Sequence, residues 1–246
     1  MVTVLCDSVP FHNLRAVLFD KDGTLADVSH LLRELGDRRA ESVNRRVPGV
    51  GVSLRRAFGL AAGGSVDMRG ALAVASRFEN EVSAATYIAA QGYGWSESLA
   101  IAQRAFNDVD VALGPKAPLT PPFPEVQRCL EQLKTAGLKL GIVSADSPIF
   151  VNEFVDHYGL RSLCPVALGS TPTCLKPDPQ LLIQACAQLQ VFPHEVLVVG
   201  DASSDVALAR NSRSAGVAVL RRIPDLQDHD FGADAYLQTL DEMRVA

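Results

Sequence analysis

Two aspartates that flank a single residue follow a short apolar run near the amino terminus, and this arrangement limits the folds open to the chain. The run covers residues 16–19, lies between Arg15 and Asp20, and is short and branched, which predicts a buried strand. Asp20 and Asp22 then stand at the carboxyl end of that strand, where open α/β sheets bind ligands, and Gly23 allows a sharp turn. Two carboxylates this close need a shared proton or a metal ion, so the spacing suggests a nucleophile, an acid/base and a cation. The alternative is a plain Asp-Gly turn.

The composition predicts an ordered chain without an affinity for polyanions. Of its 246 residues, 48% are hydrophobic and 21% charged, which is enough apolar material for one large domain or two smaller ones. The net charge of −5 gives no basic excess, so neither nucleic acid nor an anionic membrane surface is an expected partner. Apolar runs stay shorter than the ~18 residues of a membrane span.

The cysteines point to a reducing compartment. There are five of them, an odd number, and none is spaced Cys-x-x-Cys, so we expect neither a disulfide framework nor a structural zinc site. The first 14 residues lack the basic start and long apolar stretch of a secretory signal. We therefore expect a cytoplasmic protein.

The second half of the chain alternates between helical and strand patterns, which predicts a doubly wound parallel sheet with helices on both faces. The strand at residues 15–19 belongs to the same sheet. The expected helices cover residues 125–136, 147–158, 178–190 and 203–213, and the expected strands cover 140–143, 166–168, 196–199, 216–220 and 235–237.

A long helical segment interrupts this sheet after its first strand. No convincing strand pattern lies between residues 28 and 115, where we expect helices at 28–46, 52–60, 67–90 (with Asp67 as its cap) and 96–113. Five prolines between residues 115 and 124 then suggest a stiff linker or hinge. The predicted domains are an α/β core of residues 1–27 and 116–246, and a helical domain of residues 28–115.

Three further segments place polar groups at strand ends or helix starts. Ser144 directly follows a predicted strand and can hold a phosphate oxygen together with the backbone N–H groups after it, or it can simply cap a helix. Lys176 precedes a helix and can neutralise a phosphate, or it can be a solvated surface lysine. Asp201 and Asp205 follow the strand at 196–199 and offer the oxygen ligands that Mg²⁺ prefers, although Asp205 also suits the first turn of a helix.

Together and in this order, these segments resemble the haloacid dehalogenase superfamily, in its phosphoglycolate-phosphatase-like branch. The resemblance covers residues 15–27 and about 124–240, and the insert resembles the helical cap of that family. Its carriers are Asp20-x-Asp22-Gly23-Thr24, Ser144, Lys176-Pro177-x-Pro179 and Gly200-Asp201-x-x-x-Asp205.

The resemblance implies a role for each matching position. Asp20 would attack phosphorus to form an aspartyl-phosphate, and Asp22 would protonate the leaving alcohol and then activate water. Mg²⁺ would bind the carboxylates of Asp20 and Asp201 and the backbone carbonyl of Asp22, with Asp205 helping to hold the metal site. Ser144 and Lys176 would bind the phosphoryl group. Backbone N–H groups would assist them at Lys21 and at Ala145, where the family usually has Asn.

The expected activity is therefore Mg²⁺-dependent hydrolysis of a small phosphate monoester, phosphoglycolate-like, by a monomer or homodimer. Dehalogenation does not need the acid at Asp22, which argues against it, whereas a phosphomutase or a catalytically silent binding module on the same fold stays open. Substrate choice would fall to the helical cap. Its candidate anion-binding arginines, each equally explained as part of a solvated helix face, are Arg45, Arg46, Arg55, Arg56 and Arg69.

Overall fold

The chain divides into two compact units, each described here by itself. The computed structural model describes residues 1–61, 63–68, 70–221 and 231–246. One unit combines residues 1–27 with residues 120–246, and the other comprises residues 28–119.

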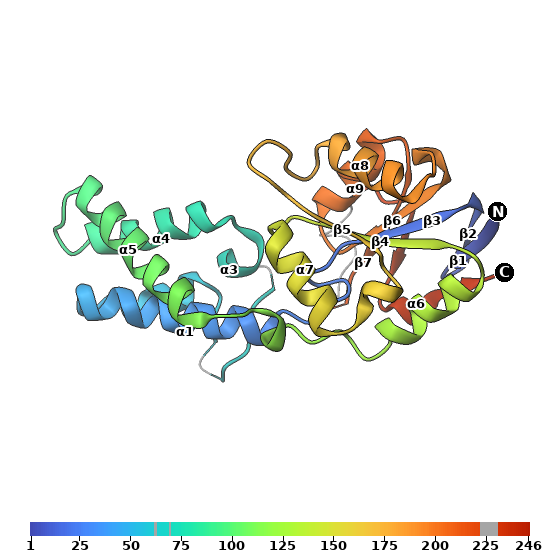
Figure 1. Cartoon of the computed structure of the whole chain (residues 1–246). Coiled ribbons are helices and arrows are strands. Elements are labelled where there is room, and N and C mark those ends of the chain that lie inside the picture. Colours follow the sequence, from blue (N-terminus) through green and yellow to red (C-terminus); the bar gives the residue numbers. More distant parts are fainter. Residues whose placement is uncertain (62, 69, 222–230) are drawn as a thin grey trace. The chain divides into compact units, whose positions relative to one another are not determined.

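A parallel sheet of six strands forms the centre of the first unit (Figure 1). Every neighbouring pair in it is parallel, and the strand order is β5-β4-β3-β6-β7-β8. This arrangement confirms the predicted α/β fold. The strands are β3 (Ala16–Phe19), β4 (Lys139–Ser144), β5 (Val166–Gly169), β6 (Val196–Gly200), β7 (Ala215–Val219) and β8 (Ala235–Leu237).

Helices cover both faces of this sheet because successive side chains of a strand point to opposite faces. In β3, Val17 and Phe19 pack in the core cluster that contains α6 (Val126–Thr135) and α7 (Pro148–His157). Leu18 belongs to the opposite cluster, which contains α8 (Pro179–Leu189) and α9 (Ser203–Asn211). Because both faces are buried, β3 is apolar throughout, as its sequence predicted.

The central position of β3 brings three loops together. Its neighbours are β4 on one side and β6 on the other, with Phe19 in register with Ile142 and with Val199. The carboxyl ends of the three strands are therefore adjacent, and the chain reverses its strand order at this point. Such a reversal is where open α/β sheets bind ligands.

A second, antiparallel sheet in the first unit was not predicted. It has the order β2-β1-β9, from β1 (Val2–Cys6), β2 (Val9–Leu14) and β9 (Met243–Val245). A two-residue turn at Asp7 and Ser8 joins the first two strands. No strand was predicted in the first 14 residues, although this turn between two apolar stretches is a signal for a hairpin.

The second unit is helical, and the described part of residues 28–115 contains no strand beyond an isolated bridge. Phe58 and Phe106 meet edge to face in its core, with ring centroids 6.1 Å apart. Its helices are α1 (Ser29–Arg46), α2 (Gly51–Ala57), α3 (Ala71–Val74), α4 (Arg77–Ala89) and α5 (Trp95–Leu113). Short 3₁₀ turns elsewhere cover Ala117–Leu119, Leu160–Ser162, Pro193–Glu195 and Leu240–Glu242.

The predicted single helix over residues 67–90 is wrong, because a cap interrupts it. Ser76 adopts an extended backbone, and its hydroxyl accepts a hydrogen bond from the N–H of Glu79 at 3.2 Å. The Glu79 carboxylate in turn accepts one from the N–H of Ser76 at 2.6 Å. This reciprocal capping box starts α4 at Arg77 and separates it from α3, so the cap is Ser76 and not Asp67.

The two chain crossings between the units are hydrogen-bonded to each other within the first unit. The N–H of Asp27 donates to the carbonyl of Pro121 at 2.8 Å, and the N–H of Phe123 donates to the carbonyl of Leu25 at 2.9 Å. Ala26 and Pro122 form an antiparallel bridge between them. The chain therefore leaves this unit and re-enters it through one paired segment.

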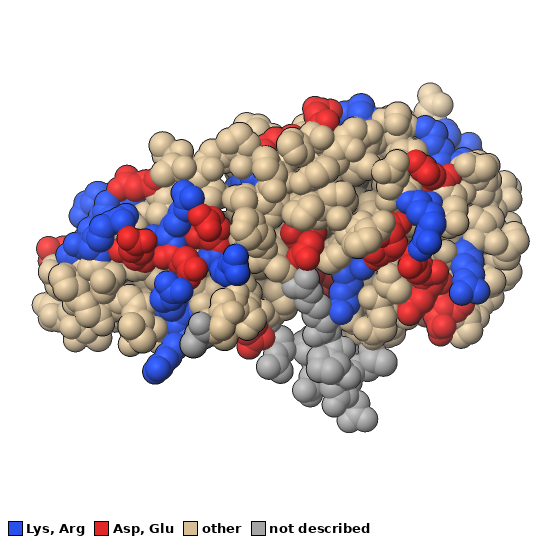
Figure 2. Space-filling model, turned by 90° about the horizontal axis from the view of Figure 1, so that it is seen from below, with Lys and Arg blue, Asp and Glu red and all other residues tan. Residues whose placement is uncertain are grey.

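Charged side chains of both signs are interspersed over the face shown in Figure 2. The ion pairs of the described residues include Arg46 with Asp108 and Arg128 with Asp241. Among the described residues, the helices are too short or too polar to cross a membrane.

Candidate active site

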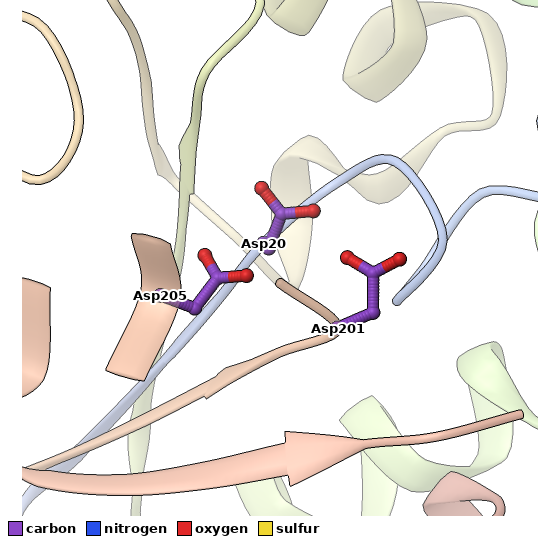
Figure 3. A group of neighbouring side chains, drawn as sticks. All are labelled: Asp20, Asp201 and Asp205. Carbon is purple, nitrogen blue, oxygen red and sulfur yellow. The ribbon is translucent and has the colours of Figure 1, made fainter. Parts of the chain in front are cut away.

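Three aspartates converge at the carboxyl end of the parallel sheet. Asp20 follows β3, Asp201 follows β6, and Asp205 lies in the first turn of α9. One carboxylate oxygen from each lies within 4.8 Å of the others (Figure 3). The strand order brings together side chains that are 185 residues apart in the sequence, from position 20 to position 205.

Lys176 compensates part of this negative charge. Its side chain is 2% exposed, and its ammonium lies 2.7 Å from Asp20 Oδ1, 2.5 Å from Asp205 Oδ1 and 2.7 Å from the carbonyl oxygen of Val143. The contacts with Asp20 and with the Val143 carbonyl are hydrogen bonds, and the contact with Asp205 is an ion pair. Lys176 thus fixes Asp20 and Asp205 directly.

Burial, together with the remaining negative charge, raises the pKa values of Asp20 and Asp201. Burial raises the pKa of Asp20 to about 7, with Asp205 and Asp22 adding to the rise and Lys176 opposing it. Burial also raises the pKa of Asp201, and the charges of Asp20 and Asp205 raise it further. Three carboxylates share a single ammonium here, and all their ligand atoms are oxygen. That donor set suits a hard divalent cation such as Mg²⁺.

Two glycines make room for the carboxylates. Gly23 has φ +81°, and a Cβ built there would lie 1.8 Å from Asp201 Oδ2. A Cβ at Gly200 would lie 2.1 Å from Cγ of Asp205. The backbone therefore approaches both acids more closely than any side chain would permit.

Ser144 lies at the end of β4, beside Asp20. It is buried, and its hydroxyl accepts a hydrogen bond from the N–H of Asp146 at 3.1 Å. The next residue, Ala145, is exposed. Ser170, which sequence reasoning missed, joins this loop to Lys176: its hydroxyl donates to the carbonyl of Ser144 at 3.1 Å and accepts from the N–H of Lys176 at 3.2 Å. Its position just after β5 was the available signal.

Asp22 is the more accessible of the two aspartates in the first loop, with 37% of its side chain exposed. The side chain of Lys21 is 3% exposed and lies between two carboxylates, 2.5 Å from Asp22 Oδ1 and 3.2 Å from Asp146 Oδ2. Burial acts to lower the pKa of Lys21, but the charges of Asp22 and Asp146 outweigh it and raise the pKa. The side chain of Lys21 is thus committed to protein carboxylates, and sequence reasoning gave Asp146 no role.

A largely buried arginine, Arg221, is bonded to the same loop. Arg221 donates to the carbonyl of Thr24 at 2.9 Å, pairs with Glu125 and lies over the ring of Phe123, 3.9 Å from its centroid. Thr239 donates to the same Glu125 oxygen at 2.9 Å. These contacts join distant parts of the sequence, so no local sequence pattern could predict them.

Most of the candidate arginines of the helical unit pair with acids of that unit. Arg45 lies 3.1 Å from Glu41, Arg55 lies 2.7 Å from Asp37, and Arg46 pairs with Asp108. Arg45 and Arg46 also line a pocket of about 380 Å³. Arg69 lies outside the described residues.

The fold and the acid cluster are those of an α/β protein with a carboxylate site at the carboxyl end of a parallel sheet. The family model of haloacid dehalogenase-like hydrolases matches residues 14–213, and the chain belongs to this family. These findings confirm the predicted family and enzyme class.

Curated relatives of the chain are phosphatases. It is 27% identical to a phosphoglycolate phosphatase of Vibrio vulnificus strain CMCP6, over 95% of this chain and 97% of the relative. It is 29% identical to an N-acetylmuramic acid 6-phosphate phosphatase of Pseudomonas putida, over 94% and 95%. A further match, 30% identical to a phosphoglycolate phosphatase of Psychrobacter arcticus, spans about half of each protein, 47% of this chain and 50% of the relative.

Solved structures share the fold. A predicted phosphoglycolate phosphatase from Haemophilus somnus 129PT superposes with a TM-score of 0.63 at 21% identity, covering 94% of this chain and 96% of that one. A dehalogenase captured as an intermediate complex superposes with a TM-score of 0.55 at 19% identity, covering 94% and 96%. At these identities the likeness shows the fold alone.

Proposed function

We propose that the chain is a Mg²⁺-dependent phosphatase that hydrolyses a small phosphate monoester through an aspartyl-phosphate on Asp20. The observation that carries this proposal is the buried Asp20 carboxylate, held by Lys176 at 2.7 Å beside the carboxylates of Asp201 and Asp205. A second acid, Asp22, stands two residues further on. Dehalogenation has no leaving alcohol to protonate and no use for that acid.

The residues account for two successive displacements at phosphorus. An oxygen of Asp20 bonds to phosphorus while the ester P–O bond breaks, and Asp22 gives its proton to the leaving oxygen. Asp22 then takes a proton from water, whose oxygen bonds to phosphorus while the Asp20–phosphorus bond breaks. Inorganic phosphate and free Asp20 result. The hydroxyl of Ser144 already accepts one hydrogen bond and still has its own hydrogen to donate to a phosphoryl oxygen.

The carboxylates of Asp20 and Asp201 and the backbone carbonyl of Asp22 would hold Mg²⁺. Asp205 supports this set, since one of its oxygens contacts Lys176 and the other accepts from the N–H of Ala202 at 2.9 Å. Mg²⁺ supplies charge neutralisation, which phosphoryl transfer needs more than covalent chemistry. Lys176 contributes to the same end by holding Asp20 in place.

We further propose that the substrate is a phosphate monoester that also bears a carboxylate, with the helical unit acting as the cap that selects it. Phosphoglycolate and N-acetylmuramic acid 6-phosphate, from which two relatives take their names, both carry such a group. Arginines of residues 28–119 are the candidate partners for that carboxylate.

The test is release of phosphate from 4-nitrophenyl phosphate, with and without Mg²⁺, by the wild type and by Asp20→Asn. Turnover should require Mg²⁺ and fall by about 10⁴-fold or more in the variant, because the nucleophile is lost. Asp156→Asn, an exposed Asp of α7, is the matched control and should keep full activity. Undiminished turnover by Asp20→Asn would contradict the proposal.

A panel of esters then separates the remaining functions. A carboxylate-selective phosphatase hydrolyses 2-phosphoglycolate or N-acetylmuramic acid 6-phosphate faster than ethyl phosphate or N-acetylglucosamine 6-phosphate, which lack the carboxylate. A phosphomutase would isomerise a sugar phosphate without releasing phosphate. A binding module would bind an ester and leave it intact.

A further inference from the structure

Lys21 occupies an unusual position for a charged side chain. It stands between the two aspartates that the proposed mechanism uses, yet its side chain is only 3% exposed. Its ammonium lies 2.5 Å from Asp22 Oδ1 and 3.2 Å from Asp146 Oδ2, and 5.8 Å from the ring centroid of Phe154 in α7. A buried ammonium is costly unless it is paired in this way, so the arrangement specifies where the lysine points.

Asp146 is itself firmly held, which makes it an anchor for the lysine. Its Oδ1 accepts a hydrogen bond from the N–H of Ser147 at 2.9 Å. Its own N–H donates to Ser144 Oγ at 3.1 Å, and its carbonyl accepts from the N–H of Ser170 at 2.8 Å. The backbone of the loop after β4 is thereby fixed on two sides. The remaining carboxylate oxygen of Asp146 faces Lys21.

Among the described residues, Lys21 is the one that donates a hydrogen bond to the Asp22 side chain. Its side chain is 37% exposed, so without a partner it would be free to sample several rotamers in solvent. Lys21 binds one of its oxygens and connects it to the fixed loop that carries Ser144. The chain Asp146–Lys21–Asp22 thus ties the proposed proton donor to the proposed phosphate-binding loop.

We propose that Lys21 is a positioning residue, which holds the Asp22 carboxyl group in line with the leaving oxygen by anchoring it to Asp146. This inference rests on the proposed function, because it takes Asp22 as the proton donor. A simpler role for Lys21 would be to attract the phosphate by its charge. The two roles differ in one respect: positioning of an acid matters only when the leaving group needs a proton.

Two esters of similar size separate these roles. Benzyl phosphate loses an alkoxide that must be protonated, whereas 4-nitrophenyl phosphate loses a stable phenolate that leaves without help. We would measure kcat/KM for both, because this quantity reports the steps up to departure of the leaving group. Asp22→Asn calibrates the comparison, with a loss of roughly 100-fold or more on benzyl phosphate and a much smaller loss on 4-nitrophenyl phosphate.

Lys21→Met should also lose more kcat/KM on benzyl phosphate than on 4-nitrophenyl phosphate, but the loss should be smaller than that of Asp22→Asn. We expect kcat/KM to fall roughly 10- to 100-fold on benzyl phosphate and by less than about threefold on 4-nitrophenyl phosphate. Equal losses on both esters would show that the lysine acts through its charge, and no loss on either would show that it has no part; both outcomes overturn the proposal. If Asp22→Asn itself shows no selectivity, the proton-donor role is wrong and the inference fails with it.

Asp146→Asn tests the same inference by weakening the anchor of Lys21, while the side chains of Lys21 and Asp22 stay unchanged. It should reproduce the selective loss on benzyl phosphate, by roughly three- to tenfold. Added to Lys21→Met it should have no further effect, because it acts through the lysine. Additive losses would overturn the proposal. Lys139→Met, at the opposite end of β4 where the ammonium donates to Leu189, is the matched control and should leave both rates unchanged.

Discussion

Two glycines determine how closely the backbone approaches the acid cluster. Gly23 and Gly200 allow the backbone to lie against the carboxylates of Asp201 and Asp205. Gly23 lies in the loop after β3 and Asp201 lies in the loop after β6, so these two loops approach each other closely at this contact. A site built in this way tolerates no added atom at that contact.

Gly23→Ala should therefore abolish most of the activity. The new Cβ would lie 1.8 Å from Asp201 Oδ2, so the carboxylate must move, and we expect turnover of 4-nitrophenyl phosphate to fall by about 100-fold or more. Gly137 offers a matched control, because its φ of +91° is also positive but nothing lies within 4 Å of a Cβ there. Gly137→Ala should cost about 1–2 kcal/mol of stability and leave turnover unchanged. Equal activity in the two variants would contradict this account.

Sequence patterns at the residue scale predicted aspartates that converge in the structure, but not the contacts around them. Asp20, Asp22 and Asp201 could be singled out because each follows an apolar run that forms a strand. The partners of Lys21 could not, since a lysine between two aspartates can point to solvent, to phosphate or inward. The structure turns it inward because Asp146, 125 positions later, reaches the same place.

At the scale of elements, the end of β7 is joined to the start of α6 by a buried ion pair. Arg221 and Glu125 are 11% and 9% exposed in their side chains, and the arginine also donates to the carbonyl of Thr24. The pair therefore stabilises the fold and holds the loop that carries Asp20 and Asp22. Burial acts to raise the pKa of Glu125, but the hydrogen bonds and charge of Arg221, a backbone hydrogen bond and the hydrogen bond from Thr239 together outweigh it and lower the pKa.

Glu125→Gln should lower the free energy of unfolding by about 3 kcal/mol at neutral pH, because Arg221 loses its partner while still buried. The sign with pH follows from the lowered pKa of Glu125. Its contribution is present above the unfolded value of about 4.3 and is lost as pH falls through the folded value. Urea unfolding of the wild type should thus become easier below about pH 4.3, and the variant should lack this component. Glu131→Gln, an exposed change on the same helix, should match the wild type.

Helices and strands of the core that have a clear apolar pattern could be predicted from the sequence. Boundaries and strands that depend on contacts with other residues could not. β3 and β6 are short apolar runs followed by aspartates, so their type and position were evident. The division between α3 and α4 depended on the reciprocal bonds of Ser76 and Glu79, which outweighed an apolar pattern that continues across them. The small sheet needed β9, whose three residues form a strand only beside β1.

At the scale of the whole molecule, the cysteines separate into buried thiols and one accessible thiol. Burial raises the pKa of Cys6, Cys129 and Cys164 to about 12 and that of Cys186 to about 11. Cys174, in the segment between β5 and α8, is partly exposed. The reduced state expected from the sequence is therefore compatible with the core, where four thiols pack as small apolar groups.

Labelling of the native protein with an aromatic disulfide reagent should modify a single thiol quickly. We expect this to be Cys174, because the other four thiols are buried and out of reach of the reagent in the folded protein. Cys174→Ser should remove the fast phase, and all five wild-type thiols should react once the protein is unfolded in urea. Rapid labelling of two or more thiols under native conditions would contradict the described packing.

The pairing of residues 25–27 with residues 121–123 would allow the helical unit to be removed or replaced. The N–H of Asp27 and the carbonyl of Pro121 are 2.8 Å apart, so the two ends of the interrupted core already meet. A turn of a few residues could close them, and the 92 residues from 28 to 119 would be dispensable for the continuity of the sheet. The helical unit is in this sense an insertion at a single point of the core. We expect that its sequence can be lengthened, exchanged or redesigned without altering the register of β3 and β6, which Asp20 and Asp201 follow.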